Sequence, residues 1–270
     1  CGMPLGRRMI FVLLEVKDLN ISLTSEKSVA EHISFRLGQG EMLSIVGSSG
    51  AGKTTICKAI MGLLGNTYRA DGEILFQGED LLDLPERKRQ TIYGKEICLI
   101  MQNPMTAFNP SIRVGRQMEK TYLLHHGKTP RQEMQRLFAA ILQKLGLEDT
   151  QRILNSYPFT LSGGMLQRLM IAAALMCQPA LLVADEATTA IDACNRIGLM
   201  RELKSFCKDG MSVLFVTHDL RSASVSDRIL VMDRGQIVEQ GKTEQILNTP
   251  KEDYTKYLLN ACRLERREMS

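Results

Sequence analysis

Two patterns of apolar and polar residues alternate along this chain and predict which parts form strands and which form helices. Between residues 11 and 81, apolar and polar positions alternate in short runs, with a turn expected at 71–72, which is typical of half-exposed strands. Continuous apolar runs lie at 42–47, 180–185 and 212–217, and such runs are typical of strands buried on both faces of a parallel sheet. Because helical patterns separate these runs, the sequence predicts an α/β fold around a parallel sheet.

The pattern becomes mainly helical between residues 104 and 175. In its clearest helical segment, Pro130 stands at the predicted first helical position and Gly146 marks the predicted end. Thr129 and Gln132 have the spacing of a capping box at the start of this segment. The sequence therefore predicts a helical subdomain, at about 104–175, inserted into the α/β core.

The composition is that of an ordinary folded protein. Hydrophobic residues make up 44% of the 270 residues and charged residues 24%, with both signs interleaved, which excludes disordered and collagen-like classes. We expect one core domain at 9–250, with the helical subdomain inserted, and a short C-terminal tail at 251–270.

Charge and cysteine content exclude further classes. The 34 Lys and Arg residues against 30 Asp and Glu residues give a net charge of +4, too small to indicate nucleic-acid binding. The seven cysteines are odd in number and contain no C-x-x-C pair, so neither a disulfide framework nor a zinc site is indicated, and a reducing cytoplasm is expected. The longest apolar run, at 9–16, is far shorter than the roughly 18 to 20 residues that span a bilayer. If the protein works at a membrane, another chain must span it.

The segment GSSGAGKT, which follows the apolar run at 42–47, is the first candidate binding site. It matches the pattern G-x-x-x-x-G-K-[ST] between a strand and a helix, a context that disfavours an ordinary glycine-rich turn. Glycines let backbone N–H groups surround a phosphate, and the helix N-terminus adds its positive end. We expect Lys53 to bind the β and γ phosphates and Thr54 to bind Mg²⁺. The expected nucleotide-binding residues are Gly47, Ser48, Ser49, Gly50, Ala51, Gly52, Lys53, Thr54 and Thr55.

The segment ALLVADE supplies a second part of the same site. An apolar strand that ends in Asp185 can hold Mg²⁺ at the carboxyl edge of the sheet. Glu186 follows directly, where a carboxylate can accept a proton from an attacking water, and it is the predicted general base. A merely solvated acidic pair at a strand end is the alternative, and the nearby phosphate-loop motif disfavours it.

A third motif, LSGGM, stands about 20 residues before Asp185. Ser162, Gly163 and Gly164 can form a second phosphate-binding helix N-terminus, although this motif alone would more often be a plain helix start. One nucleotide does not need two such cradles in one chain.

The order of these motifs resembles that of the ATP-binding-cassette (ABC) ATPases. Gln102 follows the strand ICLIM and His218 follows the strand SVLFVT, so the chain carries, in order, phosphate loop, Gln, LSGG, Asp-Glu and His. The resemblance implies a P-loop ATPase core with a parallel sheet, an N-terminal antiparallel β part and the inserted helical subdomain. It also implies ATP and Mg²⁺ as ligands and two nucleotide-binding domains arranged head to tail, in which the LSGG helix of one closes over the ATP of the other.

The resemblance also assigns residue roles. Gln102 would sense Mg²⁺ and the attacking water, and His218 would contact the γ phosphate, so both are expected in the catalytic site together with Glu186. Asp192 would belong to a loop that crosses the dimer interface.

Four positions depart from the family pattern. Leu23 stands near where an aromatic residue often stacks on adenine, which puts base stacking in doubt. Met165 replaces the usual Gln after LSGG, Ala187 replaces Pro after Asp-Glu, and Ile191 replaces Leu before Asp192. None of the four removes a charge from the reaction.

Three segments resemble those of one branch of this family, which serves importers of peptides, nickel and metal-chelating small molecules. These segments are MQNPMTAFNP, YPFTLSGGMLQR and DYTKYLL. The chain stops soon after DYTKYLL, as in short nickel-type ATPase subunits. The resemblance implies a second, different ATPase subunit, two transmembrane permeases, an extracellular solute-binding protein as an indirect partner and a place at the cytoplasmic face of the membrane. No nucleic-acid partner is expected.

Two other functions compete with this interpretation. A soluble ABC ATPase of DNA repair, chromosome structure or translation would typically carry a long coiled coil, a zinc module or a second cassette, and the sequence shows none of these. A regulatory module without turnover is disfavoured because Glu186 and His218 are both present.

Overall fold

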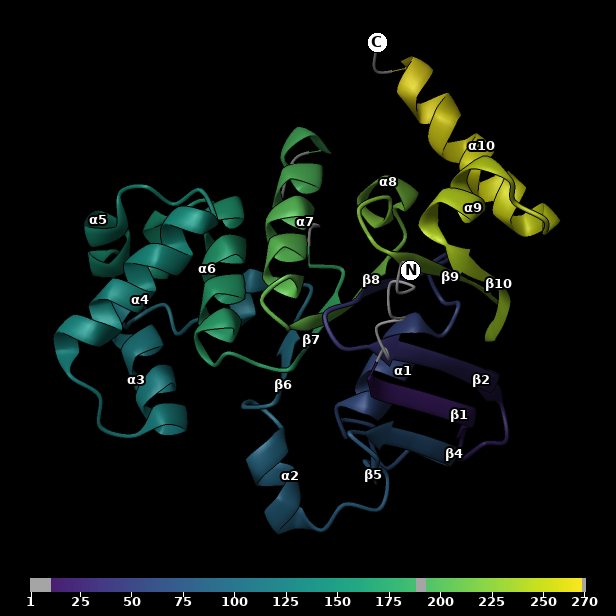
Figure 1. The fold of residues 1–270 in the computed structure, drawn as a ribbon, viewed down its shortest axis with the longest axis horizontal. Helices are drawn as coiled ribbons and strands as arrows, with labels where there is room; N and C mark the ends of the chain where they lie inside the picture. The colour runs from purple at the N-terminus through teal and green to yellow at the C-terminus, as the bar shows by residue number, and fades with distance from the viewer. Residues whose placement is uncertain (1–10, 188–192, 269–270) are drawn as a thin grey trace, which may run out of the picture.

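The computed structural model describes residues 11–187 and 193–268, and two β-sheets organise this part of the chain (Figure 1). The first sheet is antiparallel, with strands in the order β2-β1-β4-β5. Its strands are β1 (Val12–Leu23), β2 (Ser28–Gly38), β4 (Tyr68–Phe76) and β5 (Glu79–Asp80).

The second sheet has the strand order β10-β9-β3-β8-β7-β6. Its strands are β3 (Met42–Val46), β6 (Ile97–Ile100), β7 (Leu181–Asp185), β8 (Ser212–Thr217), β9 (Arg228–Asp233) and β10 (Gln236–Lys242). All neighbouring strands from β6 to β9 pair in parallel, and only β10 pairs antiparallel, with β9. The α/β fold predicted from the apolar runs is thereby confirmed.

The two faces of the second sheet bury different parts of the molecule. Alternate side chains point to opposite faces of a strand. Phe215 of β8 packs into a core with the inserted helices, whereas its neighbour Leu214 packs into a core with α1 (Lys53–Ile60) and the antiparallel sheet. The parallel sheet therefore separates the inserted helices from α1.

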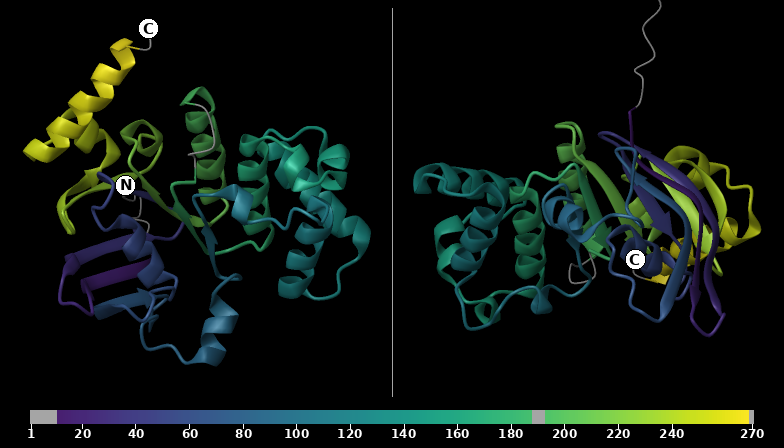
Figure 2. Two further views of the ribbon diagram at one scale, coloured as in Figure 1. Left: turned by 180° about the vertical axis from the view of Figure 1, so that it is seen from behind. Right: turned by 90° about the horizontal axis from the view of Figure 1, so that it is seen from below.

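The helices of the insertion lie together at one end of the molecule, and the C-terminal helix lies at the other (Figures 1 and 2). The inserted elements are η1 (Pro104–Thr106), α3 (Val114–His126), α4 (Arg131–Lys144), α5 (Thr150–Asn155), η2 (Pro158–Thr160) and α6 (Gly163–Met176). The remaining helices are α2 (Glu86–Ile92), α7 (Ala193–Cys207), α8 (Leu220–Ala223), α9 (Thr243–Asn248) and α10 (Asp253–Glu268).

The start of α4 differs from the sequence prediction. The helix begins at Arg131, and Pro130 is its N-cap with ψ 131°, so Pro130 is not the first helical residue. The hydroxyl of Thr129 donates to the Gly127 carbonyl instead of capping the helix, so the predicted capping box with Gln132 is wrong. The predicted end is confirmed, because α4 stops at Lys144 and Gly146 follows with φ 68°.

The turn predicted at Asp71 and Gly72 is also wrong, because β4 runs through both residues. The register shifts there, and Asp18 and Leu19 of β1 together stand opposite Gly72. Gly72 has φ 113°, and a Cβ on it would lie 2.6 Å from the Asp18 carbonyl oxygen. This glycine accommodates a β-bulge rather than a chain reversal.

The tail is a helix that packs on the core. Leu258 and Leu259 of α10 pack against buried Val46, Leu220 and Ile246. None of the helices within residues 11–187 and 193–268 has the length and apolar character needed to cross a bilayer.

Candidate functional site

Four neighbouring strands of the parallel sheet deliver the predicted site residues to one edge. Because β3, β8, β7 and β6 are adjacent and parallel, the residues that follow their carboxyl ends gather there. The phosphate loop follows β3, Glu186 follows β7, His218 follows β8 and Gln102 comes two residues after β6.

The predicted phosphate loop is a tight turn between β3 and α1. Gly50 and Gly52 have φ values of 84° and 94°, a region that side chains disfavour. A Cβ on Gly47 would lie 2.2 Å from the Met232 carbonyl oxygen, so this glycine allows the loop to pass close to β9. Gly52 is the N-cap of α1 and uses no side chain to cap the helix, which leaves this helix end to the loop's backbone.

Lys53 lies folded back over this loop. Its side chain is only 5% exposed, and Nζ donates to the carbonyl oxygens of Gly47 at 2.8 Å and Ser48 at 2.7 Å. Burial lowers the pKa of Lys53, while the carboxylates of Glu186 and Asp185 oppose that shift. A buried ammonium with nearby carboxylates is suited to bind a polyanion at the mouth of the loop.

Thr54 and Asp185 bring the phosphate loop and β7 together. The Thr54 hydroxyl donates to Oδ1 of Asp185 at 3.2 Å. Burial raises the pKa of Asp185, and the hydrogen bond from Thr54 opposes this rise. A hydroxyl and a carboxylate are hard oxygen donors of the kind that Mg²⁺ prefers, so this pair fits the ion expected from the sequence.

Glu186 is the centre of a three-residue cluster. Its Oε2 accepts from Nε2 of Gln102 at 2.6 Å, and its Oε1 lies 3.2 Å from Nδ1 of His218. Residues 84 and 32 positions away in sequence therefore hold the two oxygens of one carboxylate.

The backbone of Glu186 helps to fix this arrangement. Its N–H donates to the Val216 carbonyl at 2.8 Å, and its φ is 48°, which is unusual for a residue with a side chain. Such conformations cost energy and occur often at functional sites. The position of the Glu186 carboxylate, the predicted base, is therefore fixed by its backbone conformation as well as by Gln102 and His218.

A supporting residue was missed in the sequence. Asp219 follows His218 and is the N-cap of α8, where it accepts from the Arg221 N–H at 2.9 Å and from the Ser222 hydroxyl at 2.8 Å. It also forms an ion pair with Arg196 of α7 at 3.7 Å. An Asp directly before a helix is a common N-cap, and this signal was available in the sequence.

The LSGG segment lies elsewhere in the chain. Ser162 is the N-cap of α6 and accepts from the Met165 N–H at 3.3 Å, so the predicted helix start is confirmed. Ser162 and Gly163 are exposed and Gly164 is half-buried. The body of α6 packs on the sheet face opposite α1, so the sheet lies between this helix and the helix that follows the phosphate loop.

Three other positions singled out in the sequence have different outcomes. Leu23 ends β1 and is paired across the sheet with Tyr68, an aromatic residue at the start of β4. Asp192 and Ile191 lie outside the described residues.

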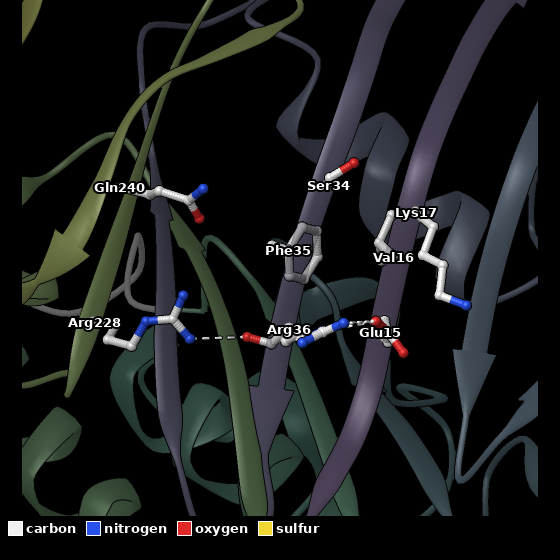
Figure 3. Close-up of a pocket in the computed structure, with 8 residues that line it drawn as sticks. All are labelled: Glu15, Val16, Lys17, Ser34, Phe35, Arg36, Arg228 and Gln240. Carbon is white, nitrogen blue, oxygen red and sulfur yellow. Dashed lines mark hydrogen bonds and ion pairs between the residues drawn. The ribbon is translucent and has the colours of Figure 1, made fainter.

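A separate hollow of about 400 Å³ lies between β1, β2 and the strands β9 and β10 (Figure 3). Arg36 pairs with Glu15 at 2.6 Å there, and Arg228 donates to the Arg36 carbonyl at 3.0 Å. Arg228 begins β9 next to Leu43, so the hollow lies at the amino end of the parallel strands, away from the phosphate loop.

Known proteins with similar sequences include ATP-binding proteins of import and transport systems. Residues 30–189 match the family model described as ABC transporter. The chain is 41% identical to the metal-staphylopine import system ATP-binding protein CntD of Staphylococcus aureus, over 92% of both chains. It is also 41% identical to the oligopeptide transport ATP-binding protein OppD of Bacillus subtilis, over 92% of this chain and 71% of that protein.

Solved structures of ATP-binding cassettes and transporter subunits also match this chain. The ATP-binding cassette MJ0796, solved as a dimer bound to ADP and phosphate, matches with a TM-score of 0.75 and 27% identity over 85% of this chain and 98% of that one. For fold alone, cbiO1 of Clostridium perfringens, part of the transporter complex cbiONQ, matches with a TM-score of 0.77 at 23% identity over 96% and 97%. The chain therefore belongs to the ABC transporter family, as one of its ATP-hydrolysing subunits.

Proposed function

We propose that this chain powers an importer for peptides or for metal–chelator complexes, with nickel as the metal to test first. The names of its relatives, a metal-staphylopine import protein and an oligopeptide transport protein, support this class of cargo. The same names disfavour DNA repair and translation. The single observation that carries the hydrolytic part is the Glu186 carboxylate, held by Gln102 and His218 beside the Thr54–Asp185 pair.

The phosphate loop binds the triphosphate of ATP in this proposal. Backbone amides of the loop from Ser49 to Thr55 surround the phosphates, and Lys53 moves its ammonium from the loop carbonyls to the β and γ phosphates. Thr54 and Asp185 hold Mg²⁺. When bound, this ion supplies positive charge that neutralises the phosphate oxygens.

Glu186 acts as the general base. A water attacks the γ phosphorus, the bond to the β–γ bridging oxygen breaks, and the water gives a proton to the Glu186 carboxylate. Gln102 orients Glu186 and the water through its amide, and His218 contacts the γ phosphate. ADP and phosphate are the products.

The site is completed by a second cassette. Ser162, Gly163 and Gly164 stand at the N-terminus of α6, and we place them against the ATP of a second, different ABC ATPase subunit. The dimeric MJ0796 cassette supports this pairing.

Two permease subunits complete the importer, with this chain at the cytoplasmic face of the membrane and a solute-binding protein outside. Exposed Met101 and Met105 flank Gln102, and exposed Phe159 precedes LSGG. Apolar side chains exposed beside Gln102 are suited to receive a permease segment, and the hydrogen bond from Gln102 to Glu186 connects this surface to the proposed base.

Purification of the full chain from detergent-solubilised membranes tests this function. We expect a second ABC ATPase and two membrane permeases to co-purify, and cells that lack this chain to lose uptake of radiolabelled nickel with its chelator or of labelled dipeptide. Co-purification of ribosomes or DNA, with both uptake activities unchanged, would contradict the proposal.

A further inference from the structure

The C-terminal helix reaches the phosphate loop through one tyrosine. The hydroxyl oxygen of Tyr254, in the first turn of α10, accepts a hydrogen bond from the backbone N–H of Ser48 at 3.1 Å. The two residues are 206 positions apart in the sequence. The motif DYTKYLL indicated a family branch, but the site described so far gives this tyrosine no role.

The contact with Tyr254 adds to the hydrogen bonds that hold the backbone of Ser48. Its carbonyl oxygen accepts from Lys53 Nζ at 2.7 Å, while its N–H is bonded to Tyr254. The backbone N–H and C=O of Ser48 are therefore both held, the C=O by Lys53 and the N–H by α10. A loop that is fixed before the ligand arrives loses less entropy on binding.

The rest of α10 is anchored to the same region. Leu258 packs in the cluster that contains Val46, the residue before Gly47. Arg221, three residues after His218, donates to the Cys262 carbonyl of α10 at 2.6 Å. The carboxylate of Glu239 accepts from the backbone N–H groups of residues 251 and 252 just before α10, at 2.9 and 3.2 Å.

We propose that Tyr254 is a positioning residue for nucleotide binding: α10 uses its hydroxyl to hold the phosphate loop in the form that receives ATP. The proposal rests on the assignment of Gly47–Thr55 as the phosphate loop in the proposed function. Tyr254 touches the loop and not the reacting atoms, so its loss should act on affinity more than on the chemical step.

Replacing Tyr254 with Phe in the full chain tests this role, because the ring and its packing remain while the hydroxyl is lost. A neutral hydrogen bond of this kind corresponds to roughly a twofold to tenfold change in binding, so we expect MgATP to bind Tyr254→Phe that much more weakly. The KM for ATP should rise by a similar factor, with turnover at saturating ATP within about twofold of the unaltered chain.

The matched control is Tyr257→Phe. Tyr257 stands on the same helix, its ring lies 6.5 Å from that of Tyr254, and it is 67% exposed. This variant should bind MgATP like the unaltered chain. Without nucleotide, Tyr254→Phe should unfold at a slightly lower temperature than Tyr257→Phe because the hydrogen bond to Ser48 is lost. Only Tyr254→Phe should also show a smaller rise in unfolding temperature when MgATP is added.

The outcomes separate this proposal from the function on which it rests. Equal MgATP affinity of Tyr254→Phe and the unaltered chain would overturn the positioning role, as would equal losses in both variants or a fall in turnover at unchanged affinity. If the unaltered chain itself did not bind MgATP, the phosphate-loop assignment would fail instead.

Discussion

The phosphate loop and the LSGG segment are both glycine-containing turns at helix N-termini, yet their surroundings differ. The phosphate loop has a buried ammonium, Lys53, and two carboxylates, Asp185 and Glu186, within its reach. The first turn of α6 has no acidic residue, and its cap is the hydroxyl of Ser162. The first surroundings have the charged groups that we propose bind and hydrolyse a nucleotide, whereas the second offer backbone amides, a helix dipole and one hydroxyl.

Their positions explain how both are used. The parallel sheet separates α1 from α6, so neither segment completes the other within one chain. In the proposed function, each chain carries two halves that belong to two different sites, and changes in the two halves should then produce different defects.

The largest effect is expected in the catalytic half, from Glu186→Gln. The amide keeps the shape but cannot accept the proton, and general base catalysis is typically worth about 10² to 10⁴ in rate. Hydrolysis in the assembled complex should fall by that factor while MgATP still binds. Glu133→Gln, at an exposed position of α4, is the control and should hydrolyse ATP normally. An unchanged rate in Glu186→Gln would remove the assignment of the base.

Ser162→Arg, in the LSGG segment, should stop ATP hydrolysis by the assembled complex. It should not weaken the binding of ATP to the chain's own phosphate loop. The arginine places bulk and charge where the partner's phosphates should lie, and loss of one such donor site typically costs about 10² to 10³ in rate. Titration of MgATP and hydrolysis by the assembled complex are the two measurements. Asn155→Arg, exposed on the same helical part, should behave like the unaltered chain, and a loss of MgATP affinity in Ser162→Arg would contradict the separation of the halves.

Lys53→Ala should produce the reverse pattern, with the defect in binding. A hydrogen bond to a charged group contributes about 1.5 to 3 kcal/mol, so MgATP affinity should fall roughly 10- to 100-fold. Lys58→Ala, exposed on the same helix, is the matched control and should change affinity little. Equal affinities of Lys53→Ala and Lys58→Ala would mean that Lys53 does not reach the phosphates.

The smallest effect concerns the base of the nucleotide. Stacking on an aromatic ring is worth about 1 to 3 kcal/mol relative to Ala, and Leu23 supplies part of this contact. Leu23→Tyr should therefore tighten MgATP binding about twofold to fivefold, with binding of inorganic triphosphate unchanged. If the affinity for ATP stays the same, Leu23 does not face the base, and Tyr68 opposite it becomes the next residue to vary.

Local signals in the sequence predicted most of the elements that carry the site. Strand β3, the loop before Lys53 and the cap of α6 at Ser162 each depend on residues that are neighbours in the chain. The place of Glu186 directly after Asp185 predicted it as the base, and the order of the motifs, through the family resemblance, predicted Gln102 and His218 as site residues.

Several of the features that were missed depend on contacts between distant segments. The bulge at Gly72 is set by the register of β1 against β4, which a single-strand pattern does not contain. The positive φ of Glu186 and the bond from Ser48 to Tyr254 likewise join segments that only the folded chain brings together. Pro130 has an extended ψ although proline is common at the first helical position, because an N-cap residue is itself not helical.

To test whether a complete site needs two chains, the rate of ATP hydrolysis and the molecular mass of the protein are measured on the same samples. The rate of ATP hydrolysis per chain is followed across a dilution series, with and without a second ATPase subunit, while light scattering reports the oligomeric state. If a complete site needs two chains, the rate per chain should be close to zero when the protein is monomeric. The rate should then rise in proportion to the fraction of chains in dimers. A strictly monomeric preparation with the same per-chain rate as the dimer would contradict it.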